Sequence, residues 1–434
     1  MRTFVSAILS IVATAGSWAQ EAGALPTADL AAFLREAETN SPAIRAAAAR
    51  LSSAQSAPSQ ASALPDPEVS VAYLNDGVSS FTLGESEFST LSFTWWQEVP
   101  YPGKRGQREE VAAHEAEGAS SDLARVRLEV LAAVKAAYAD LYRFDQTTLV
   151  LTETKNVLEA FAEAARLRYE VGEGIQESVL KAQTEILRME ADLARVAQDR
   201  RGAEVRLNAA AGRVTDTPIG PASLLPEAEL PLDAEDLADR AVARSPAIAT
   251  LRAAVLREEA AVRLARLDLK PDFLWSASYQ NRGGLDPMVM GSFGLRLPIF
   301  REGKQRQALV QSEANLLAVG HEQAELQIQV RASVRELIAR FSRADRLRTL
   351  FGEGVIPQAR SALQSAQSAY GVGRLGFLDL LNDLTVVLNA RIELVSQEAD
   401  RLQALAALEP LVVEELIRVQ GGDEGQGGGN AVND

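Results

Sequence analysis

The chain changes its hydrophobic period abruptly at the stretch from Val99 to Gln107. Before this stretch, from Phe88 to Val99, apolar and polar residues alternate as they do in a β-strand. After it, apolar residues follow the helical period of 3.6 to about Tyr169. The same change recurs at Leu297 to Gln307. The sequence therefore predicts, twice, a strand that leads into a very long helix.

Each very long helix is expected to be followed by a shorter one. The first covers Arg105 to Tyr169, about 65 residues or about 100 Å at 1.5 Å per residue. The second runs from Lys304 to Tyr370. Pro357 predicts a kink in it, because proline in a helix interior costs about 3 kcal/mol. The shorter helices are expected from Ile175 to Gly212 and from the turn after Tyr370 to about Arg418.

Four features occur twice in the same order, which indicates an internal duplication of about 200 residues. Each copy has a Ser-Pro-Ala-Ile helix start, a pair of alternating runs, a Gly-Lys turn and a Tyr-x-Val-Gly turn. In the first copy these features begin at Ser41, Glu68, Gly103 and Tyr169. In the second copy they begin at Ser245, Phe273, Gly303 and Tyr370.

Each pair of alternating runs predicts a β-hairpin with one apolar face and one face of small or polar residues. In the first hairpin a polar loop at 76–87 joins the runs 68–75 and 88–99. In the second a tight loop at 281–287 joins the runs 273–280 and 289–297. The apolar faces carry Tyr73, Trp95, Tyr279 and Phe293, whereas Arg296 lies on the other face.

Composition narrows the class of protein. The chain has 434 residues, of which 47% are hydrophobic, so it can bury a core. Its net charge of −15 argues against a nucleic-acid partner. It has no cysteine, and therefore no disulfide and no thiolate metal site. Residues 1–19 have the basic residue, short apolar stretch and small-residue cleavage site of a secretory signal. No later stretch reaches the ~18 continuous apolar residues of a transmembrane helix.

The predicted strands suggest how an exported chain meets a membrane. Strands of about 10 residues are long enough to cross an outer membrane when tilted. Four strands cannot close into a barrel, and open edges are not tolerated in lipid. We therefore expect several copies to pool their strands, with the apolar face toward lipid and the polar face toward a wet lumen. In each repeat, two shorter helices stacked end to end would match the long helix in length.

These features resemble the TolC-like outer-membrane efflux channels over nearly the whole chain after the signal. The resemblance is carried by the duplication, the Pro-Gly-Lys-Arg turn at 102–105 and the Tyr-x-Val-Gly turns. The segments 97–105, 356–359 and 377–381 are most similar to the heavy-metal branch, the CzcC and CusC type. The family implies a mainly α homotrimer, in which duplicated long helices form a coiled-coil barrel. Four membrane strands per chain would complete a 12-stranded barrel.

The resemblance also implies a division of the chain and a function. Hairpins at 67–100 and 271–300 would lie in the outer membrane. Segments 41–64, 104–212, 245–270 and 303–418 would form the periplasmic helical barrel. An equatorial region and tail would take 20–40, 213–244 and 419–434. The chain would be a passive duct, without cofactor or enzymatic activity. An inner-membrane transporter of the RND type and a periplasmic adaptor would deliver substrates, with metal ions as the expected cargo.

A pore gate is implied at the periplasmic tip, where Asp379 matches the first of two acidic positions of the family. Three copies of Asp379 would form a ring that favours cations. The alternative is an ordinary surface aspartate near a helix start, which the helix dipole favours. The second acidic position falls on Asn382, with Asp383 adjacent.

Tyr370 matches a gate tyrosine of the family. Its usual acidic partner falls on Ser178, beside Glu177, and the gate arginine falls on Leu375, beside Arg374. The gate is therefore expected to use altered contacts. The two turns would be docking tips for the adaptor, and they comprise Val171, Gly172, Glu173, Gly174, Val372, Gly373, Arg374 and Leu375.

The change of period is interpreted as the joint between membrane and periplasm. Proline and glycine there end the strand and permit unusual dihedral angles, and Lys104 and Arg105 are expected at the level of the lipid headgroups. The second joint has a longer linker, so the two should differ in shape. The joint residues are Pro100, Pro102, Gly103, Lys104, Arg105, Pro298, Gly303 and Lys304.

The sequence shows no catalytic constellation and no metal site. Neither His114 nor His321 has a neighbour at ligand spacing, and a solvated helix position explains each. Met288 and Met290 could form a soft copper contact, but a loop tip or barrel rim suffices. Type I protein secretion and drug efflux remain alternative channel functions. A secreted structural coiled-coil protein is a further alternative, although it would leave the aromatic hairpins without a role.

Overall fold

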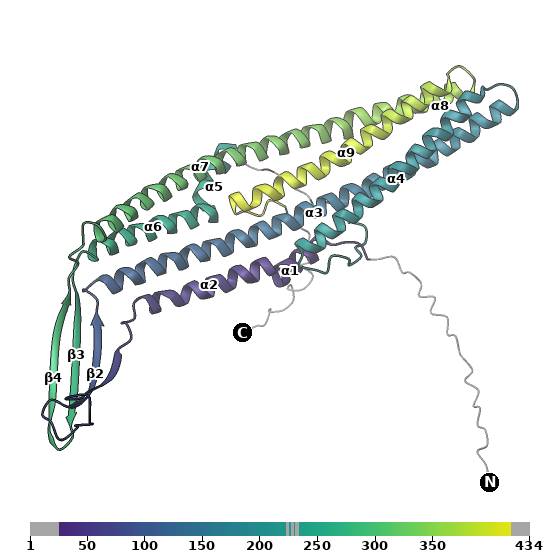
Figure 1. The fold of residues 1–434 in the computed structure, drawn as a ribbon. Helices are drawn as coiled ribbons and strands as arrows, with labels where there is room; N and C mark the ends of the chain where they lie inside the picture. The colour runs from purple at the N-terminus through teal and green to yellow at the C-terminus, as the bar shows by residue number, and fades with distance from the viewer. Residues whose placement is uncertain (1–25, 223–224, 227–229, 231–233, 418–434) are drawn as a thin grey trace, which may run out of the picture.

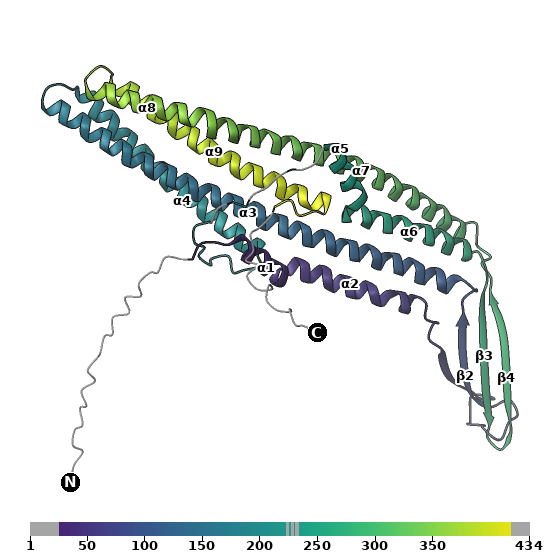
Figure 2. The ribbon, with the colours of Figure 1, turned by 180° about the vertical axis from the view of Figure 1, so that it is seen from behind.

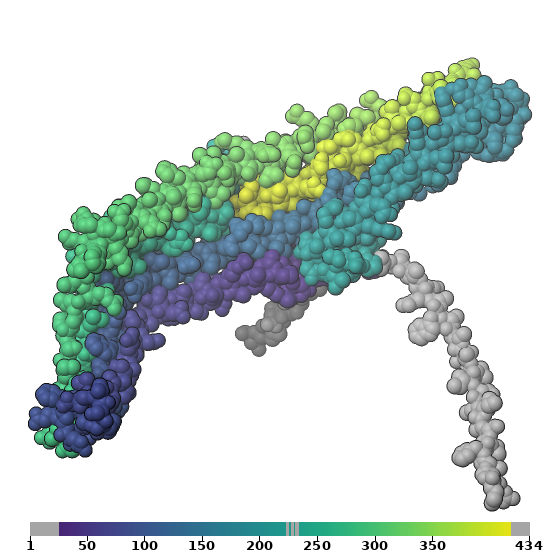
Figure 3. Space-filling view, viewed as in Figure 1, coloured from purple at the N-terminus to yellow at the C-terminus, as the bar shows by residue number. Residues whose placement is uncertain are grey.

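A computed structural model describes residues 26–222, 225–226, 230 and 234–417. The described residues form a long helical rod with a β-sheet at one end (Figures 1, 2 and 3). The first repeat comprises α1 (Leu30–Asn40), α2 (Pro42–Ala61), β1 (Glu68–Leu74), β2 (Thr90–Val99), α3 (Lys104–Glu170) and α4 (Gln176–Ala210). The second comprises α5 (Ala234–Arg244), α6 (Pro246–Leu267), β3 (Asp272–Arg282), β4 (Leu285–Arg296), α7 (Gln305–Thr349), the π-helical turn η1 (Leu350–Val355), α8 (Ile356–Gly371) and α9 (Phe377–Val412). The predicted signal at 1–19 and the tail at 419–434 lie outside the described residues.

The four strands form one antiparallel sheet in the order β1-β2-β3-β4. Its register sorts the side chains by face, as the alternation predicts. One transverse row runs through Val71, Phe93, Tyr279 and Val289, and the adjacent row on the other face runs through Ser70, Thr94, Ser278 and Met290. Strands β1 and β4 form the two edges, and neither pairs with a further strand among the described residues.

The turn of the second hairpin is tighter than predicted. The expected loop at 281–287 is wrong, because the strands extend to Arg282 and resume at Leu285, leaving only Gly283 and Gly284 between them. Gly283 has φ +68°, which glycine adopts at no steric cost. A Cβ there would lie 2.4 Å from the Cα of Gly84, so the loop of the first hairpin packs directly on this turn.

The helices pair within each repeat as their lengths predict. Helices α2 and α4 lie end to end along α3, and α6 and α9 lie along α7 and α8 (Figure 1). A Cβ on Gly212 would lie 3.0 Å from the carbonyl carbon of Asn40. This close approach marks the place where the end of α4 meets the start of α2. Helix α3 also packs against α6 and α9, which joins the two repeats into one wall.

The second long helix is not the uninterrupted, kinked helix expected at Lys304 to Tyr370. The π-helical turn η1 divides it into α7 and α8. Pro357 lies in the first turn of α8, where a missing N–H removes fewer helical hydrogen bonds than it would in an interior. The wider turn therefore precedes the proline and accommodates it.

Four apolar clusters lie along the rod. Two of them lie at mid-length, where α1 and α5 cover the wall. The cluster under α1 buries Tyr138, Leu141 and Leu207, and the cluster that includes α5 buries Leu237 and Leu405. The other two lie toward the free helical end. Over the described ranges, none of the helices is both long and apolar enough to span a membrane.

Candidate functional site

Two equivalent turns form the end of the rod farthest from the sheet (Figures 1 and 2). Each has a glycine in the left-handed region, Gly172 at φ +78° and Gly373 at φ +74°. In each, the N–H of the following residue donates to a carbonyl five positions back, at 2.9 Å. Val171 and Val372 are 71% and 69% exposed. Both turns therefore present a valine to the surroundings from the same backbone geometry.

Arg168, a residue that the sequence analysis did not single out, links the two turns. Its guanidinium lies 5.0 Å from the centre of the Tyr370 ring and donates a hydrogen bond to the Tyr370 carbonyl oxygen. A Cβ on Gly373 would lie 3.0 Å from an Arg168 nitrogen. Glycine at position 373 therefore leaves room for the arginine. The second copy has Ala369 in the equivalent place, so the contact occurs in one direction only.

The ring of Tyr370 also contacts an aromatic side chain at the start of α9. It lies edge-on to Phe377, with 5.9 Å between ring centres, and Phe377 is buried at the start of α9. Burial raises the pKa of the Tyr370 hydroxyl, and the positive charge of Arg168 partly opposes this. Tyr370 therefore connects the end of α3, the end of α8 and the start of α9.

The expected acidic positions lie on the first turns of α9. Phe377 and Leu380 are buried, which turns Asp379 and Asn382 outward to exposed positions, while Asp383 is half-buried. The N-terminal end of a helix favours a carboxylate. This explains why Asp379 is stable there whether or not it has a further role.

The other predicted gate residues do not join Tyr370. Glu177 pairs with Lys181 on its own helix, at 2.7 Å. Ser178 is half-buried, and Arg374 is exposed. Leu375 packs in the apolar cluster that includes Tyr370. The side chain that reaches Tyr370 from the first repeat is thus Arg168, and not Glu177 or Ser178.

The first joint between sheet and helices is held by an ion pair between a buried lysine and a half-buried aspartate. The ammonium of Lys104 lies 2.8 Å from a carboxylate oxygen of Asp272 and donates to the carbonyl of Lys270 at 3.2 Å. The N–H of Tyr101 donates to the same Asp272 oxygen at 2.8 Å. Lys104 is 3% exposed, so the expectation that it meets lipid headgroups is wrong. Its role is to fasten the first joint to the start of β3.

The remaining joint residues show how the two joints differ. Four residues separate β2 from α3, and Gly103 at φ +94° lies immediately before the helix. Pro100 is buried, whereas Pro102 is exposed. Arg105 is exposed and donates to the Ser62 carbonyl. The second joint takes eight residues between β4 and α7, in which Pro298 is half-buried and Gly303 and Lys304 are exposed. The longer linker thus produces a looser joint.

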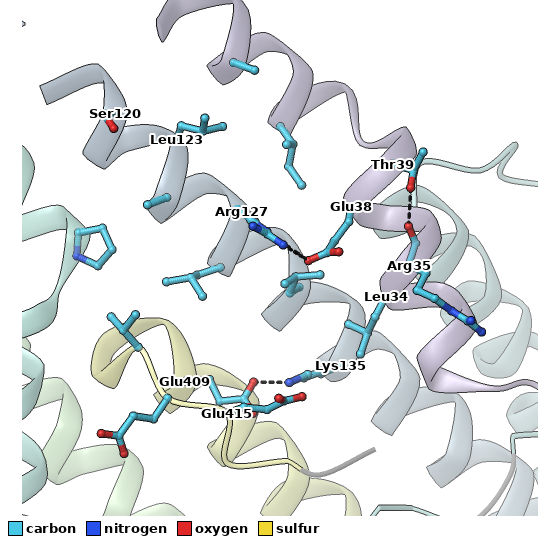
Figure 4. Close-up of a pocket in the computed structure, with 18 residues that line it drawn as sticks. Leu34, Arg35, Glu38, Thr39, Ser120, Leu123, Arg127, Lys135, Glu409 and Glu415 are labelled. Atoms are coloured by element: carbon cyan, nitrogen blue, oxygen red, sulfur yellow. Dashed lines mark hydrogen bonds and ion pairs between the residues drawn. The ribbon is translucent and has the colours of Figure 1, made fainter. Parts of the chain in front are cut away.

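An open hollow of about 1020 Å³ lies at mid-length between α1, α3 and the end of α9 (Figure 4). At its base the ammonium of Lys135 lies 2.6 Å from a carboxylate oxygen of Glu409, with both side chains under 10% exposed. The other Glu409 oxygen accepts the N–H groups of Leu416 and Ile417, each at 2.9 Å. Arg127 pairs with Glu38 at the rim. Lys135 and Glu409, and Arg127 and Glu38, therefore neutralise each other in pairs within this hollow.

A metal centre does not emerge from the geometry. In the part of the chain that the structure describes, no three His, Cys, Asp or Glu side chains gather at a common point. His114 lies 2.9 Å from a carboxylate oxygen of Glu117. Met288 and Met290 lie on β4 rather than in a loop and are about half exposed.

Comparison with known proteins identifies the family. The family model described as outer membrane efflux protein matches residues 33–213 and 237–412. The chain belongs to the outer membrane efflux protein family. Cobalt-zinc-cadmium resistance protein CzcC of Cupriavidus metallidurans is 24% identical over 378 residues, which cover 85% of this chain and 86% of CzcC.

Solved structures of outer-membrane proteins have the same fold. VceC of Vibrio cholerae matches with a TM-score of 0.75 and 20% identity, covering 88% of this chain and 96% of VceC. CusC matches with a TM-score of 0.77 and 14% identity, covering 91% and 95%. The predicted TolC-like fold and the resemblance to the heavy-metal branch are thus confirmed. This efflux protein is located in the outer membrane and extends into the periplasm.

Proposed function

We propose that three copies of this efflux protein form one continuous duct for metal ions, from the periplasm across the outer membrane. The feature that carries the proposal is the four-stranded sheet with two unpaired edges. Unpaired edges cannot remain open in lipid, and three sheets joined edge to edge would give a 12-stranded barrel. The exposed aromatic face supports the same arrangement, because Trp95, Tyr279 and Phe293 are each 41–54% exposed.

The long helices would continue the duct into the periplasm and narrow it at the tip. An inner-membrane transporter of the RND type and a periplasmic adaptor would supply the cargo and the energy. The exposed turns with Val171 and Val372 would be the docking points for the adaptor. Cobalt, zinc and cadmium are the first ions to test, because CzcC is named for resistance to these metals.

Asp379 would set the charge preference at the narrow end, as a ring of three carboxylates. The test is the reversal potential of the purified protein in planar bilayers under a salt gradient. Asp379→Asn should shift it toward lower cation selectivity. Glu336→Gln removes an exposed acid from α7 far from the tip, so it should leave the potential unchanged. Equal potentials for the Asp379 variant and the unaltered protein would contradict the ring.

The cargo is tested in cells from which this protein has been deleted. Growth should become sensitive to cobalt, zinc or cadmium salts, and re-expression of the chain should restore tolerance. Sensitivity to hydrophobic drugs alone, with metal tolerance intact, would instead indicate a drug duct. Loss of secretion of a protein substrate alone would indicate the secretion function.

A further inference from the structure

Two methionines of β4 lie on the face of the sheet that otherwise carries small or polar side chains. Met290 is in register with Ser278 of β3, and Met288 is in register with Gln280. The row of Met290 continues from Ser278 to Thr94 on β2. Side chains two positions apart on a strand share a face. Both thioethers therefore lie on the polar face, opposite the aromatic one.

Packing does not explain these two methionines. Met288 and Met290 are 51% and 52% exposed, and neither belongs to any of the four apolar clusters of the described residues. Methionine commonly fills gaps in a core, as Met189 of α4 does at 4% exposure. The chain has only three methionines besides Met1, and two of the three share this polar face.

The surrounding hydroxyl groups are already occupied, which leaves the sulfur atoms as the free ligands of this face. Thr94 donates a hydrogen bond to the hydroxyl of Ser278 at 3.0 Å, and the hydroxyls of Ser276 and Ser292 lie 2.6 Å apart. Ser276 and Ser278 are also buried, at 8% and 4% exposure. An incoming ion would therefore meet two thioethers before it met these oxygens.

The spacing of the two methionines suits a single soft cation. Their backbone positions are about 6.8 Å apart, because a strand rises about 3.4 Å per residue. Methionine has three rotatable bonds in its side chain, so the two sulfur atoms can converge on one ion between them. A thioether is a soft, uncharged ligand that selects Cu(I), whereas Mg²⁺, Ca²⁺ and Mn²⁺ prefer oxygen ligands. Ag(I) is a soft monovalent ion of the same class.

The position of the pair in the sheet would place it near the outer mouth of the proposed duct. Strand β4 begins at Leu285, directly after the turn at the end of the sheet away from the helices (Figure 1). A 12-stranded barrel is wider than an eight-stranded one, whose interior side chains fill. The pairs of three copies would therefore act separately. Two sulfur ligands hold an ion weakly, and conduction requires binding weak enough for the ion to leave.

We propose that Met288 and Met290 form a soft-metal contact on the wall of the lumen, which binds Cu(I) or Ag(I) transiently as the ion leaves the duct. The proposal rests on the proposed channel function, because the trimeric barrel is what turns the polar face toward a lumen. It adds soft monovalent ions to the cargo. The contact needs only the two sulfur atoms of one chain, so it can bind an ion without a closed metal centre.

Silver titration of the purified trimer in detergent tests the contact directly. The small number of methionines allows each methyl group to be followed by NMR after labelling with methyl-¹³C methionine. Ag(I) should shift the signals of Met288 and Met290 and leave that of buried Met189 in place. Zn(II) at the same concentrations should shift none of them. Unshifted signals of the pair with Ag(I), or equal shifts with Zn(II), would overturn the proposal.

Substitution by leucine removes the sulfur atoms at nearly constant volume. The double variant Met288→Leu, Met290→Leu should lose saturable Ag(I) binding in equilibrium dialysis, whereas Met189→Leu should retain it. Retained binding in the double variant would contradict the contact. If the double variant does not form a trimer, the titration of the unaltered protein still decides.

The channel function fails by a different observation. Cells that lack this protein and yet tolerate cobalt, zinc, cadmium and silver salts like the parent would contradict the metal duct. The NMR titration does not depend on conduction, so it would still show whether the methionine pair binds a soft ion.

Discussion

Removal of the Arg168 side chain should loosen the contact between the two turns at the free helical end, and so open the tip of the proposed duct. Arg168→Leu deletes the hydrogen bond to the Tyr370 carbonyl and the cation–π contact with its ring. A hydrogen bond from a charged group contributes about 1.5–3 kcal/mol, and an exposed cation–π contact about 0.5–1 kcal/mol. Arg168 is half-buried, so the lower end of both ranges applies. The expected loss is about 2 kcal/mol per chain, or a factor of about 30 in the equilibrium between attached and detached tips.

Single-channel recording measures this effect as the open probability of the resting channel, which should rise in Arg168→Leu. Two variants serve as controls. Arg166→Leu removes an exposed arginine two positions away that pairs only along its own helix, with Glu163 and Glu170. Tyr370→Phe keeps both the ring and the carbonyl oxygen that Arg168 uses. Both controls should therefore conduct like the unaltered protein.

Two results would refute this reasoning. An unchanged open probability in Arg168→Leu would mean that the contact does not hold the tip. A large increase in Tyr370→Phe would mean that the tyrosine hydroxyl, rather than the arginine, controls the gate. Trimer formation on a gel should be checked for each variant, so that loss of assembly is not mistaken for opening.

Three further substitutions test the buried charges. Lys135→Met should lower the free energy of unfolding by about 3–5 kcal/mol, because it leaves the carboxylate of Glu409 buried without its cation. Thermal unfolding in detergent should show this loss of stability. The double variant that also carries Glu409→Gln should recover part of it. Lys104→Met should make the trimer dissociate at lower temperature on a gel, whereas Lys304→Met at the equivalent, exposed position should not. Burial raises the pKa of Glu398, although the hydrogen bond from Tyr142 opposes this shift. Folding therefore disfavours the ionised form of Glu398. Glu398→Gln should raise the melting temperature at pH 7 because it removes that cost. That gain should vanish as the pH falls below about 4, where the carboxyl is protonated in both the folded and unfolded states; an equal gain at all pH values would contradict the assignment.

The strands and long helices could be predicted because they follow from the local spacing of apolar residues along the chain. The alternation that ends at Val99 and the helical period that starts at Lys104 follow from how side chains alternate on a strand and recur on a helix. The repetition of Tyr169 and Tyr370 in the same context predicted two equivalent turns, and the family resemblance implied their place at the tip. The strands, helices and turns themselves depend on neighbours in the sequence, so the sequence alone was sufficient for them.

The contacts that hold the site together could not be predicted in this way. The partners in each are far apart in the chain: Arg168 and Tyr370 at the tip, Lys104 and Asp272 at the joint, and Lys135 with its carboxylate at mid-length. Lys104 follows a proline and a glycine in the sequence, which is typical of an exposed turn. Its burial depends on Asp272, which the second repeat places beside it. One signal was available for Arg168, since the first copy of the turn has arginine where the second has Ala369.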